Sequence, residues 1–266
     1  MSRILEKSQK MKIASYQFGI TGDIKRNTEI IRAAVDGAAG QGIELIIFPE
    51  CALTGYPPRN MADSKAINIE EAAASLSYIR EISERLGISV IIGTIAYDNA
   101  YYNRAYIISP GQPLKCYDKR ALYGWDEENF TPGKENGIFF IGGYKIGVRI
   151  CFEVRFPEYF RELYKERTDL DIVMFNDVTD AESPERYAMI RGHLITRAVE
   201  NVTPIIAVNN VEPFQSAPTC FIDASGRVLA EATPNEEEMI VIDFLKKDPD
   251  FGEKGRKRYS DLLLGI

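Results

Sequence analysis

Short runs rich in β-branched and aromatic residues alternate with helical patterns along most of this chain, and that alternation limits its fold more than any other feature. The segments 12–18 (KIASYQF) and 44–50 (ELIIFPE) indicate strands, and the stretch between them carries apolar residues on one helical face. The apolar runs are nearly continuous, as expected of strands whose two faces are both covered. The pattern therefore predicts an α/β fold with sheets covered by helices.

The later elements follow the same alternation. A helix is predicted over 183–201, where Ser183 suits the N-cap and Pro184 the first helical position. The segment 137–151 predicts a β-hairpin that turns at Gly142 and Gly143. Further helices are predicted at 69–86 and 157–166, and further strands at 89–95, 105–110, 114–119, 171–177, 204–211, 219–224 and 238–244.

We expect one main domain with a short segment on either side. No repeat or linker-like composition interrupts the chain before about residue 245, so residues 11–245 are predicted to form a single domain. Residues 1–10 lack the apolar core of a secretory signal and are expected to be a leader outside the fold. Residues 246–266 form a tail with a basic stretch, which is most simply a solvated surface segment, or else an arm that contacts another subunit.

Charge and composition argue against several kinds of partner. The net charge of −7 at pH 7 disfavours binding to nucleic acid or to a membrane surface. No apolar run reaches the roughly 20 residues that a membrane span needs. The four cysteines show no CxxC pairing, so we expect free thiols in a reducing cytoplasm.

Cys151 ends an apolar run, so it is either a packed strand end or a nucleophile. The single histidine, His193, lies inside a predicted helix and is more readily a packed or surface residue than the base of a Cys–His pair. One histidine with scattered cysteines also argues against a closed zinc site, and we expect no cofactor. Cys51 and Cys116 are interpreted as packing residues.

Two other residues stand at comparable positions. Glu50 ends one predicted strand and Lys119 follows another, so they would share a sheet edge with Cys151 if those strands are parallel neighbours. A lysine lowers the pKa of a nearby thiol and stabilises an oxyanion, whereas a glutamate can transfer protons. Taken singly, however, each residue is equally well explained as a packed cysteine or a surface charge.

Taken together, the surrounding stretches resemble the nitrilase superfamily, the carbon–nitrogen hydrolases that act on nitriles, amides and N-carbamoyl compounds. The resemblance extends from Met11 to about Phe244. It implies a four-layer α-β-β-α sandwich of two mixed sheets, and a homodimer or higher homo-oligomer in which dimerisation extends the sandwich. The stretches that carry it are IIFPECALTGYPP (46–58), YDKRAL (117–122), FTPG (130–133) and GVRICFEVRFPE (147–158).

The resemblance further implies a catalytic triad of Glu50, Lys119 and Cys151. Cys151 would attack the substrate carbon, and the Lys119 ammonium and the backbone N–H of Phe152 would hold the oxyanion. Glu50 would move the protons. A second acid of this superfamily is expected near GWDEENFTPG (124–133), where we favour Glu127, with Asp126 or a merely solvated loop as alternatives.

Several residues are candidates for the substrate pocket. Arg155 could bind a substrate carboxylate or form a salt bridge within the fold. Tyr56 and Trp125 are candidates for the pocket wall, although aromatic residues also simply fill cores. Where many relatives carry Pro-Ala and then a tryptophan, this chain has FNDVTD, so Asn176 and Asp177 would face the pocket.

The leading interpretation is a hydrolase of a non-peptide C–N bond in a small amide, of the ω-amidase or N-carbamoyl-amidase type, that works through a cysteine thioester. Nitrile hydrolysis on the same triad and a catalytically silent scaffold of the same fold are the alternatives. A nucleotide-binding α/β protein has little support, because GAAGQG (37–42) follows a helix rather than a strand.

Overall fold

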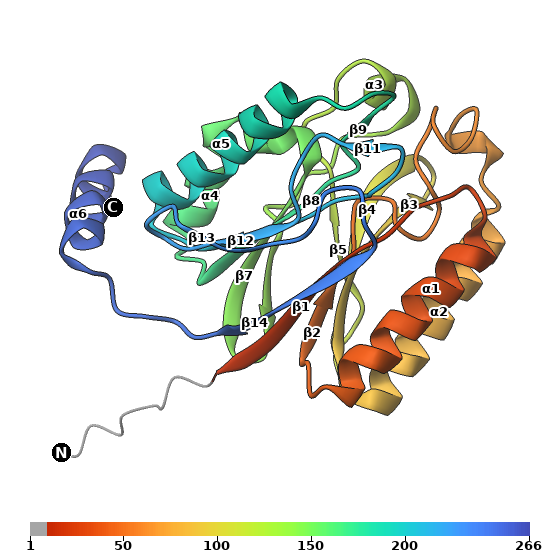
Figure 1. The fold of residues 1–266 in the computed structure, drawn as a ribbon, viewed down its shortest axis with the longest axis horizontal. Coiled ribbons are helices and arrows are strands. Elements are labelled where there is room, and N and C mark those ends of the chain that lie inside the picture. Colours follow the sequence, from red (N-terminus) through yellow and green to blue (C-terminus); the bar gives the residue numbers. More distant parts are fainter. Residues whose placement is uncertain (1–9) are drawn as a thin grey trace.

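Two six-stranded sheets lie face to face in the computed structural model, which describes residues 10–266 (Figure 1). Residues 1–9 of the expected leader therefore lie outside the described residues. In the first sheet the strand order is β14 (Glu238–Phe244), β1 (Met11–Gln17), β2 (Leu45–Ile47), β3 (Ser89–Tyr97), β4 (Tyr101–Ile108) and β5 (Lys115–Asp118). In the second it is β13 (Val228–Glu231), β12 (Cys220–Ile222), β10 (Ile205–Val208), β8 (Leu170–Met174), β7 (Tyr144–Ile150) and β6 (Ile138–Ile141).

Both sheets are mixed. In the first sheet β2 pairs in parallel with β1 and β3, whereas the outer pairs are antiparallel. In the second sheet β8 pairs in parallel with β7 and β10, and again the outer pairs are antiparallel. A short ribbon of β9 (Val178–Thr179) and β11 (Phe214–Gln215) lies beyond the second sheet.

The alternation of side chains along the strands builds the layers. Leu45 and Ile47 of β2 join the apolar core between the two sheets, whereas Ile46 faces outward to α1 (Ile24–Gly40) and α2 (Ile69–Leu86). On the opposite side α4 (Pro157–Lys165) and α5 (Pro184–Asn201) cover the second sheet. The order is therefore helix, sheet, sheet, helix, and the predicted four-layer α-β-β-α sandwich is confirmed (Figure 1).

Most predicted elements are present, with shifted ends. The helix predicted over 69–86 is α2, and it ends at Gly87 in the left-handed conformation. The helix predicted over 183–201 is α5, although Ser183 makes no side-chain capping hydrogen bond. The hairpin turning at Gly142 and Gly143 joins β6 to β7. The strand predicted over 44–50 stops at Ile47, so Glu50 lies in the loop that follows.

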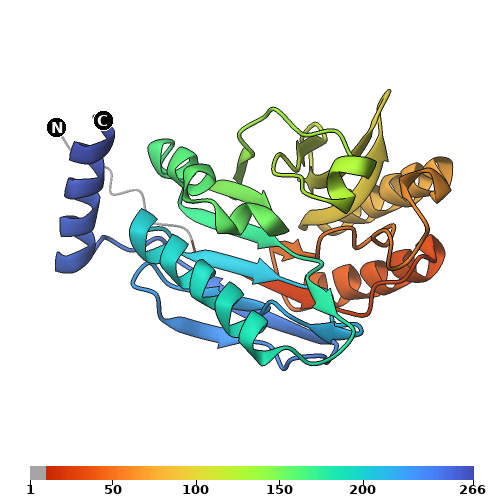
Figure 2. The same cartoon turned by 90° about the horizontal axis from the view of Figure 1, so that it is seen from above.

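The basic tail contains a helix that the sequence pattern did not predict. Residues Phe251–Leu264 form helix α6, which begins with a capping box between Asp250 and Glu253. The hydroxyl of Tyr164 on α4 donates to the carbonyl oxygen of Lys257, so α6 packs against the helices of the second sheet. Figure 2 shows α6 at one end of the molecule, beside α4 and α5. Within residues 10–266, no helix has the length and apolarity needed to cross a membrane.

Candidate active site

Glu50, Lys119 and Asp126 form a buried charged cluster at one end of the sandwich. The Lys119 Nζ atom lies 2.9 Å from Glu50 Oε1 and 2.6 Å from Asp126 Oδ2. All three side chains are almost fully buried, with exposed fractions of 2%, 1% and 7% in the order Lys119, Glu50, Asp126. Because a buried charge is costly unless it is paired, the three groups hold one another in place.

Further contacts fix the orientation of the Glu50 carboxylate. Asn103 on β4 donates through Nδ2 to Oε1 at 2.7 Å, and the backbone N–H of Asn176 donates to Oε2 at 2.8 Å. The loop that carries Glu50 passes directly over Gly93 on β3. A Cβ atom at Gly93 would lie 2.4 Å from the carbonyl oxygen of Pro49, so this close approach requires glycine.

Cys151 opens the 3₁₀ turn η2 (Cys151–Arg155), directly after β7, and adopts a φ of +47°. The buried side chain of Glu153 holds this turn. It accepts hydrogen bonds from the N–H of Ile150 at 2.7 Å and from the N–H of Arg120 at 2.8 Å. The Glu153 carboxylate thus links the backbone next to Cys151 with the backbone next to Lys119.

Electrostatic interactions connect the thiol to the charged cluster. Burial raises the pKa of Cys151 well above its ordinary value, the negative charge of Glu50 raises it further, and the positive charge of Lys119 opposes both. Burial also raises the pKa of Glu50, although Lys119 partly offsets this. Burial lowers the pKa of Lys119, but the negative charges of Glu50, Cys151 and Asp126 outweigh it, so the net shift is upward. The thiol thus interacts with a fixed, doubly paired lysine and with a carboxyl group of the kind that can accept its proton.

The three candidate catalytic residues do not come from parallel neighbours of one sheet, as the sequence suggested. Glu50 follows β2 and Lys119 follows β5, which β3 and β4 separate within the first sheet. Cys151 follows β7 of the second sheet. The hydrogen bond from Asn176, just beyond β8 of the second sheet, to Glu50 shows that both sheets contribute to one end of the sandwich.

The sequence favours Glu127 as the second acid of the site, but in the structure Asp126 occupies that position. Asp126 is the acid that contacts Lys119, and it also accepts a short hydrogen bond from the hydroxyl of Tyr56. Glu127 is exposed. Both residues belong to helix α3 (Trp125–Asn129), in which successive side chains point about 100° apart, so only one of them can face Lys119.

The other predicted pocket residues fall into two groups. Tyr56 and Asn176 contact the charged cluster directly, through Asp126 and Glu50 respectively. The remaining four lie within the described residues and do not contact the cluster through a hydrogen bond or ion pair. Phe152 stacks on the ring of Tyr123 with 5.9 Å between centroids, and the Arg155 guanidinium lies 5.7 Å from the centroid of the Phe152 ring. Asp177 forms an ion pair with Arg186, and Trp125 is 36% exposed at the start of α3.

Sequence reasoning missed Asn103, Glu153 and Arg186. Asn103 lies within YNRAYIISPGQ (102–112) before the lysine motif, and Glu153 lies two residues after Cys151, so both stood inside stretches that carried the resemblance. The sequence separation between either residue and its hydrogen-bond partners follows no recognisable pattern, so the sequence did not indicate these contacts. His193 is partly buried on α5, as predicted. Within the described part of the chain, no group of three or more His, Cys, Asp or Glu side chains is arranged to hold a metal ion.

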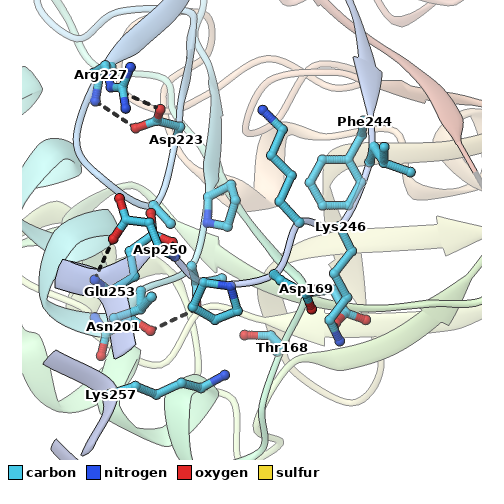
Figure 3. Close-up of a pocket in the computed structure, with 18 of the residues that line it drawn as sticks. Thr168, Asp169, Asn201, Asp223, Arg227, Phe244, Lys246, Asp250, Glu253 and Lys257 are labelled. Carbon is cyan, nitrogen blue, oxygen red and sulfur yellow. Dashed lines mark hydrogen bonds and ion pairs between the residues drawn. The ribbon is translucent and has the colours of Figure 1, made fainter. Parts of the chain in front are cut away.

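A cavity of about 370 Å³ lies at the opposite end of the second sheet (Figure 3). Thr168 and Asp169, just before β8, and Thr203 and Pro204, just before β10, line one side of it. The segment that leads from β14 to α6 closes the other side. No predicted site residue lines this cavity, so it is separate from the charged cluster.

Comparison with known proteins identifies the family of this chain. The model of the carbon–nitrogen hydrolase family matches residues 12–246. The chain belongs to this family. The carbon–nitrogen hydrolase described here is therefore an enzyme of the nitrilase superfamily, as its sequence motifs predicted.

Several relatives show how this hydrolase compares with characterised proteins. It is 31% identical over 208 residues to a 2-oxoglutaramate amidase from Bacillus subtilis, covering 74% of this chain and 76% of that amidase. It is 25% identical over 260 residues to a glutamine-dependent NAD(+) synthetase from Aquifex aeolicus, but it spans only 44% of that protein.

Solved structures share the fold. An amidase mutant from Nesterenkonia sp. AN1, which carries the acetamide moiety of fluoroacetamide on its active-site cysteine, superposes with a TM-score of 0.81 at 21% identity. The match covers 99% of this chain and 98% of that one. The α-β-β-α architecture of the hydrolase is thus that of a known amidase.

Proposed function

We propose that this hydrolase cleaves the amide bond of a small ω-amide through a thioester on Cys151. The observation that carries the proposal is the buried Lys119–Glu50 pair, whose charges both act on the Cys151 thiol. The similarity to a 2-oxoglutaramate amidase over three quarters of both chains favours an ω-amide as the substrate.

In the first half of the reaction, Glu50 accepts the proton of the Cys151 thiol while the sulfur attacks the amide carbon. An S–C bond forms and the carbonyl π electrons move to oxygen. When the oxyanion collapses, the C–N bond breaks and Glu50 passes its proton to the departing nitrogen, which leaves as ammonia. The raised pKa of Glu50 suits this exchange, because a stronger carboxylate base accepts a proton more readily.

In the second half, water replaces ammonia. Glu50 accepts a proton from the water as its oxygen attacks the thioester carbon. The C–S bond then breaks, the proton returns to the sulfur, and a carboxylic acid leaves. Asp126 and Asn103 hold Lys119 and Glu50 in place throughout.

The oxyanion would be stabilised by the Lys119 ammonium and by the backbone N–H of Phe152. Two features support this role. The negative charges of two carboxylates keep Lys119 charged despite its burial and hold it in place, and Phe152 follows Cys151 in the turn η2. Losing one oxyanion donor typically lowers kcat by about 10²–10³-fold.

Arg155 supports recognition of a substrate carboxylate. Among the described residues it forms no ion pair, so the alternative of a salt bridge within the fold receives no support from the geometry. The carboxylate of 2-oxoglutaramate lies at the opposite end of the molecule from its amide, so a cationic side chain at the end of the Cys151 turn suits a substrate of this kind.

Mass spectrometry and a substrate panel test the proposal. The protein is mixed with short ω-amides, N-carbamoyl amino acids and nitriles, and its mass and product formation are followed. We expect an acyl adduct on Cys151 and the fastest turnover with ω-amides. Undiminished turnover by Cys151→Ala would exclude the thioester mechanism, and preferred turnover of N-carbamoyl compounds or nitriles would reassign the substrate.

A further inference from the structure

Arg186 and Asp177 form a two-point ion pair that no step above uses. The guanidinium Nε lies 2.8 Å from Asp177 Oδ1, and Nη2 lies 2.9 Å from Oδ2. This parallel geometry is the strongest form of an arginine–carboxylate contact. The Asp177 side chain is only 7% exposed, whereas that of Arg186 is 41% exposed. The pair therefore has a buried acidic half and an accessible basic half.

Further contacts hold Asp177 in place. Besides Arg186, its Oδ1 accepts a short hydrogen bond from the hydroxyl of Ser216. Its backbone is fixed as well, because Asn209 accepts from its N–H at 2.9 Å and donates to its carbonyl oxygen at 2.8 Å. Asp177 therefore serves as an anchor that holds Arg186 in one orientation.

The pair lies beside the charged cluster. Asn176, the residue before Asp177, donates its backbone N–H to Glu50. Arg186 stands in the first turn of α5, on the same helical face as Ile190 and Leu194. Those two residues belong to the apolar cluster against which Cys151 and Val154 pack. Figure 1 shows that α5 begins next to β9 and β11, at the same end of the sandwich as α3.

Arg186 keeps unused hydrogen-bond donors. Its Nη1 atom makes no hydrogen bond to any described residue. A guanidinium has five N–H donors, and the ion pair uses the Nε side and one donor of Nη2. The free N–H groups of Nη1 and Nη2 form a second edge, which can donate two parallel hydrogen bonds to another carboxylate. A neutral ligand would bind to this edge more weakly than a carboxylate.

We propose that Arg186, oriented by Asp177, is a specificity residue that binds the carboxylate of the substrate beside Cys151. The proposal rests on the proposed amidase function but goes beyond it, because it makes selection for an anionic amide depend on a side chain outside the charged cluster. Arg155 and Arg186 would then both donate to the substrate carboxylate, and Asp177 would fix the direction of the Arg186 donors.

Two substrates of equal length separate recognition from chemistry. The monoamide of glutaric acid carries a carboxylate, whereas pentanamide replaces it with a methyl group. For Arg186→Gln we expect the KM of the glutaric monoamide to rise about 10- to 100-fold, as for loss of a charge-assisted hydrogen bond, with kcat nearly unchanged. The kcat/KM for pentanamide should change less than about twofold. Arg186→Lys keeps the charge without the planar donors and should give an intermediate KM.

Arg191 provides a matched control. It lies on the same helix, is also 41% exposed and pairs with Glu231 at 2.9 Å, but its partner stands on β13 at the far edge of the second sheet. Arg191→Gln should leave the KM of both substrates unchanged. Equal losses with both substrates in Arg186→Gln, or equal effects of the two arginine variants, would overturn the proposal.

Binding to an inactive protein separates this proposal from the proposed function. Calorimetry with Cys151→Ala measures the Kd of the glutaric monoamide without turnover, and the double variant Cys151→Ala/Arg186→Gln should weaken it about 10- to 100-fold. This result would support Arg186 even if the wild-type protein hydrolysed neither compound. Equal binding by both variants, or no binding by Cys151→Ala, would overturn it.

Discussion

At the residue scale, the buried ionisable groups among the described residues differ in whether they have hydrogen-bonding partners. Lys119 contacts two carboxylates, and Glu153 accepts hydrogen bonds from two backbone N–H groups near Cys151. Asp171 on β8 is different. It is 1% exposed, and neither of its carboxylate oxygens accepts a hydrogen bond from a described residue. The hydroxyl of Thr168, which lies near enough to favour its ionisation, donates to Leu163 instead.

Asp171 gives the protein a predictable pH dependence of stability. Burial raises its pKa from 3.8 to about 7. The folded protein therefore holds a proton that the unfolded chain releases above pH 3.8, so the free energy of unfolding falls as pH rises toward 7. Asp171→Asn removes this dependence. Relative to wild type, the variant should gain about 2–3 kcal/mol in unfolding free energy between pH 5 and pH 8, as measured by urea denaturation.

The control for this prediction is Asp180→Asn, which alters an aspartate whose side chain is 91% exposed. Its unfolding free energy should differ from wild type by a similar small amount at both pH values. A difference between Asp171→Asn and wild type that stays constant from pH 5 to pH 8 would show that Asp171 is not protonated in the folded state.

At the scale of single elements, the candidate catalytic residues lie just after the ends of strands rather than within them. β2 ends at Ile47, and the loop beyond it brings Glu50 over Gly93 of β3. β7 ends at Ile150, and η2 then turns Cys151 out of the strand. The hydrogen-bonded strands hold their ends in place, and the residues that follow them supply the candidate catalytic side chains.

Gly93→Ala should disturb the site more than the fold. The added methyl group would meet the backbone of Pro49, Glu50 and Cys51, so the Glu50 loop has to move. A displacement near 1 Å in a catalytic group can lower the rate about 100-fold, and we expect a loss of this size in kcat/KM. Circular dichroism should still show a folded α/β protein.

Gly192 supplies the matched control, because a Cβ atom there meets nothing within 4 Å and the residue is exposed on α5. Gly192→Ala should stabilise the helix by up to about 1 kcal/mol and leave kcat/KM unchanged. If Gly93→Ala retained full activity, the loop would not depend on this close approach.

Much of the element order could be predicted from sequence, for identifiable reasons. The helix α2 and the β6–β7 hairpin carry strong local signals in their periodicity and glycines. The short strands β9, β11 and β13 carry weak signals, because two to four residues cannot show a period. The helix α6 was missed because its charged sequence indicates solvent exposure, although Asp250 and Glu253 form a capping box.

The site could be predicted to a similar extent. Glu50, Lys119 and Cys151 stand in recognisable motifs, and the structure joins them through hydrogen bonds and electrostatic interactions. The choice between Asp126 and Glu127 depends on the rotation of a five-residue helix, which spacing alone does not fix. The partnership of Asp177 with Arg186 depends on how α5 lies against the sheet, and such packing leaves no pattern in the sequence.

At the scale of the whole molecule, the C-terminal helix α6 lies outside the four layers (Figure 2). Helix α6 lies at one end of the molecule (Figure 2) and contacts α4 and α5 through Tyr164 and Arg256, yet several of its large apolar side chains are exposed. Leu262 and Leu263 are 73% and 83% exposed, and Phe251 is 95% exposed. Large apolar side chains gathered on one exposed helix are typical of an interaction surface.

We predict that this helix contacts a second copy of the chain in a homodimer. Light scattering coupled to size exclusion should then give a mass near twice 30.0 kDa for the wild type. Leu262→Ser combined with Leu263→Ser should shift the mass toward that of a monomer, because burial of each leucine contributes about 2 kcal/mol.

Phe140→Ser is the control, since this residue is 65% exposed on the edge strand β6, away from α6. It should leave the mass unchanged. A monomeric wild type, or a dimer that tolerates both serines, would contradict the prediction for α6.

The origin of Cys151 in one sheet and of Glu50 and Lys119 in the other has a consequence for folding. A nascent or damaged chain in which only one sheet has formed possesses either the base and the ammonium or the sulfur, but never all of them together. Under the proposed mechanism such a chain would not hydrolyse amides. Activity would then require the two sheets to pack together, so turnover would report on that packing.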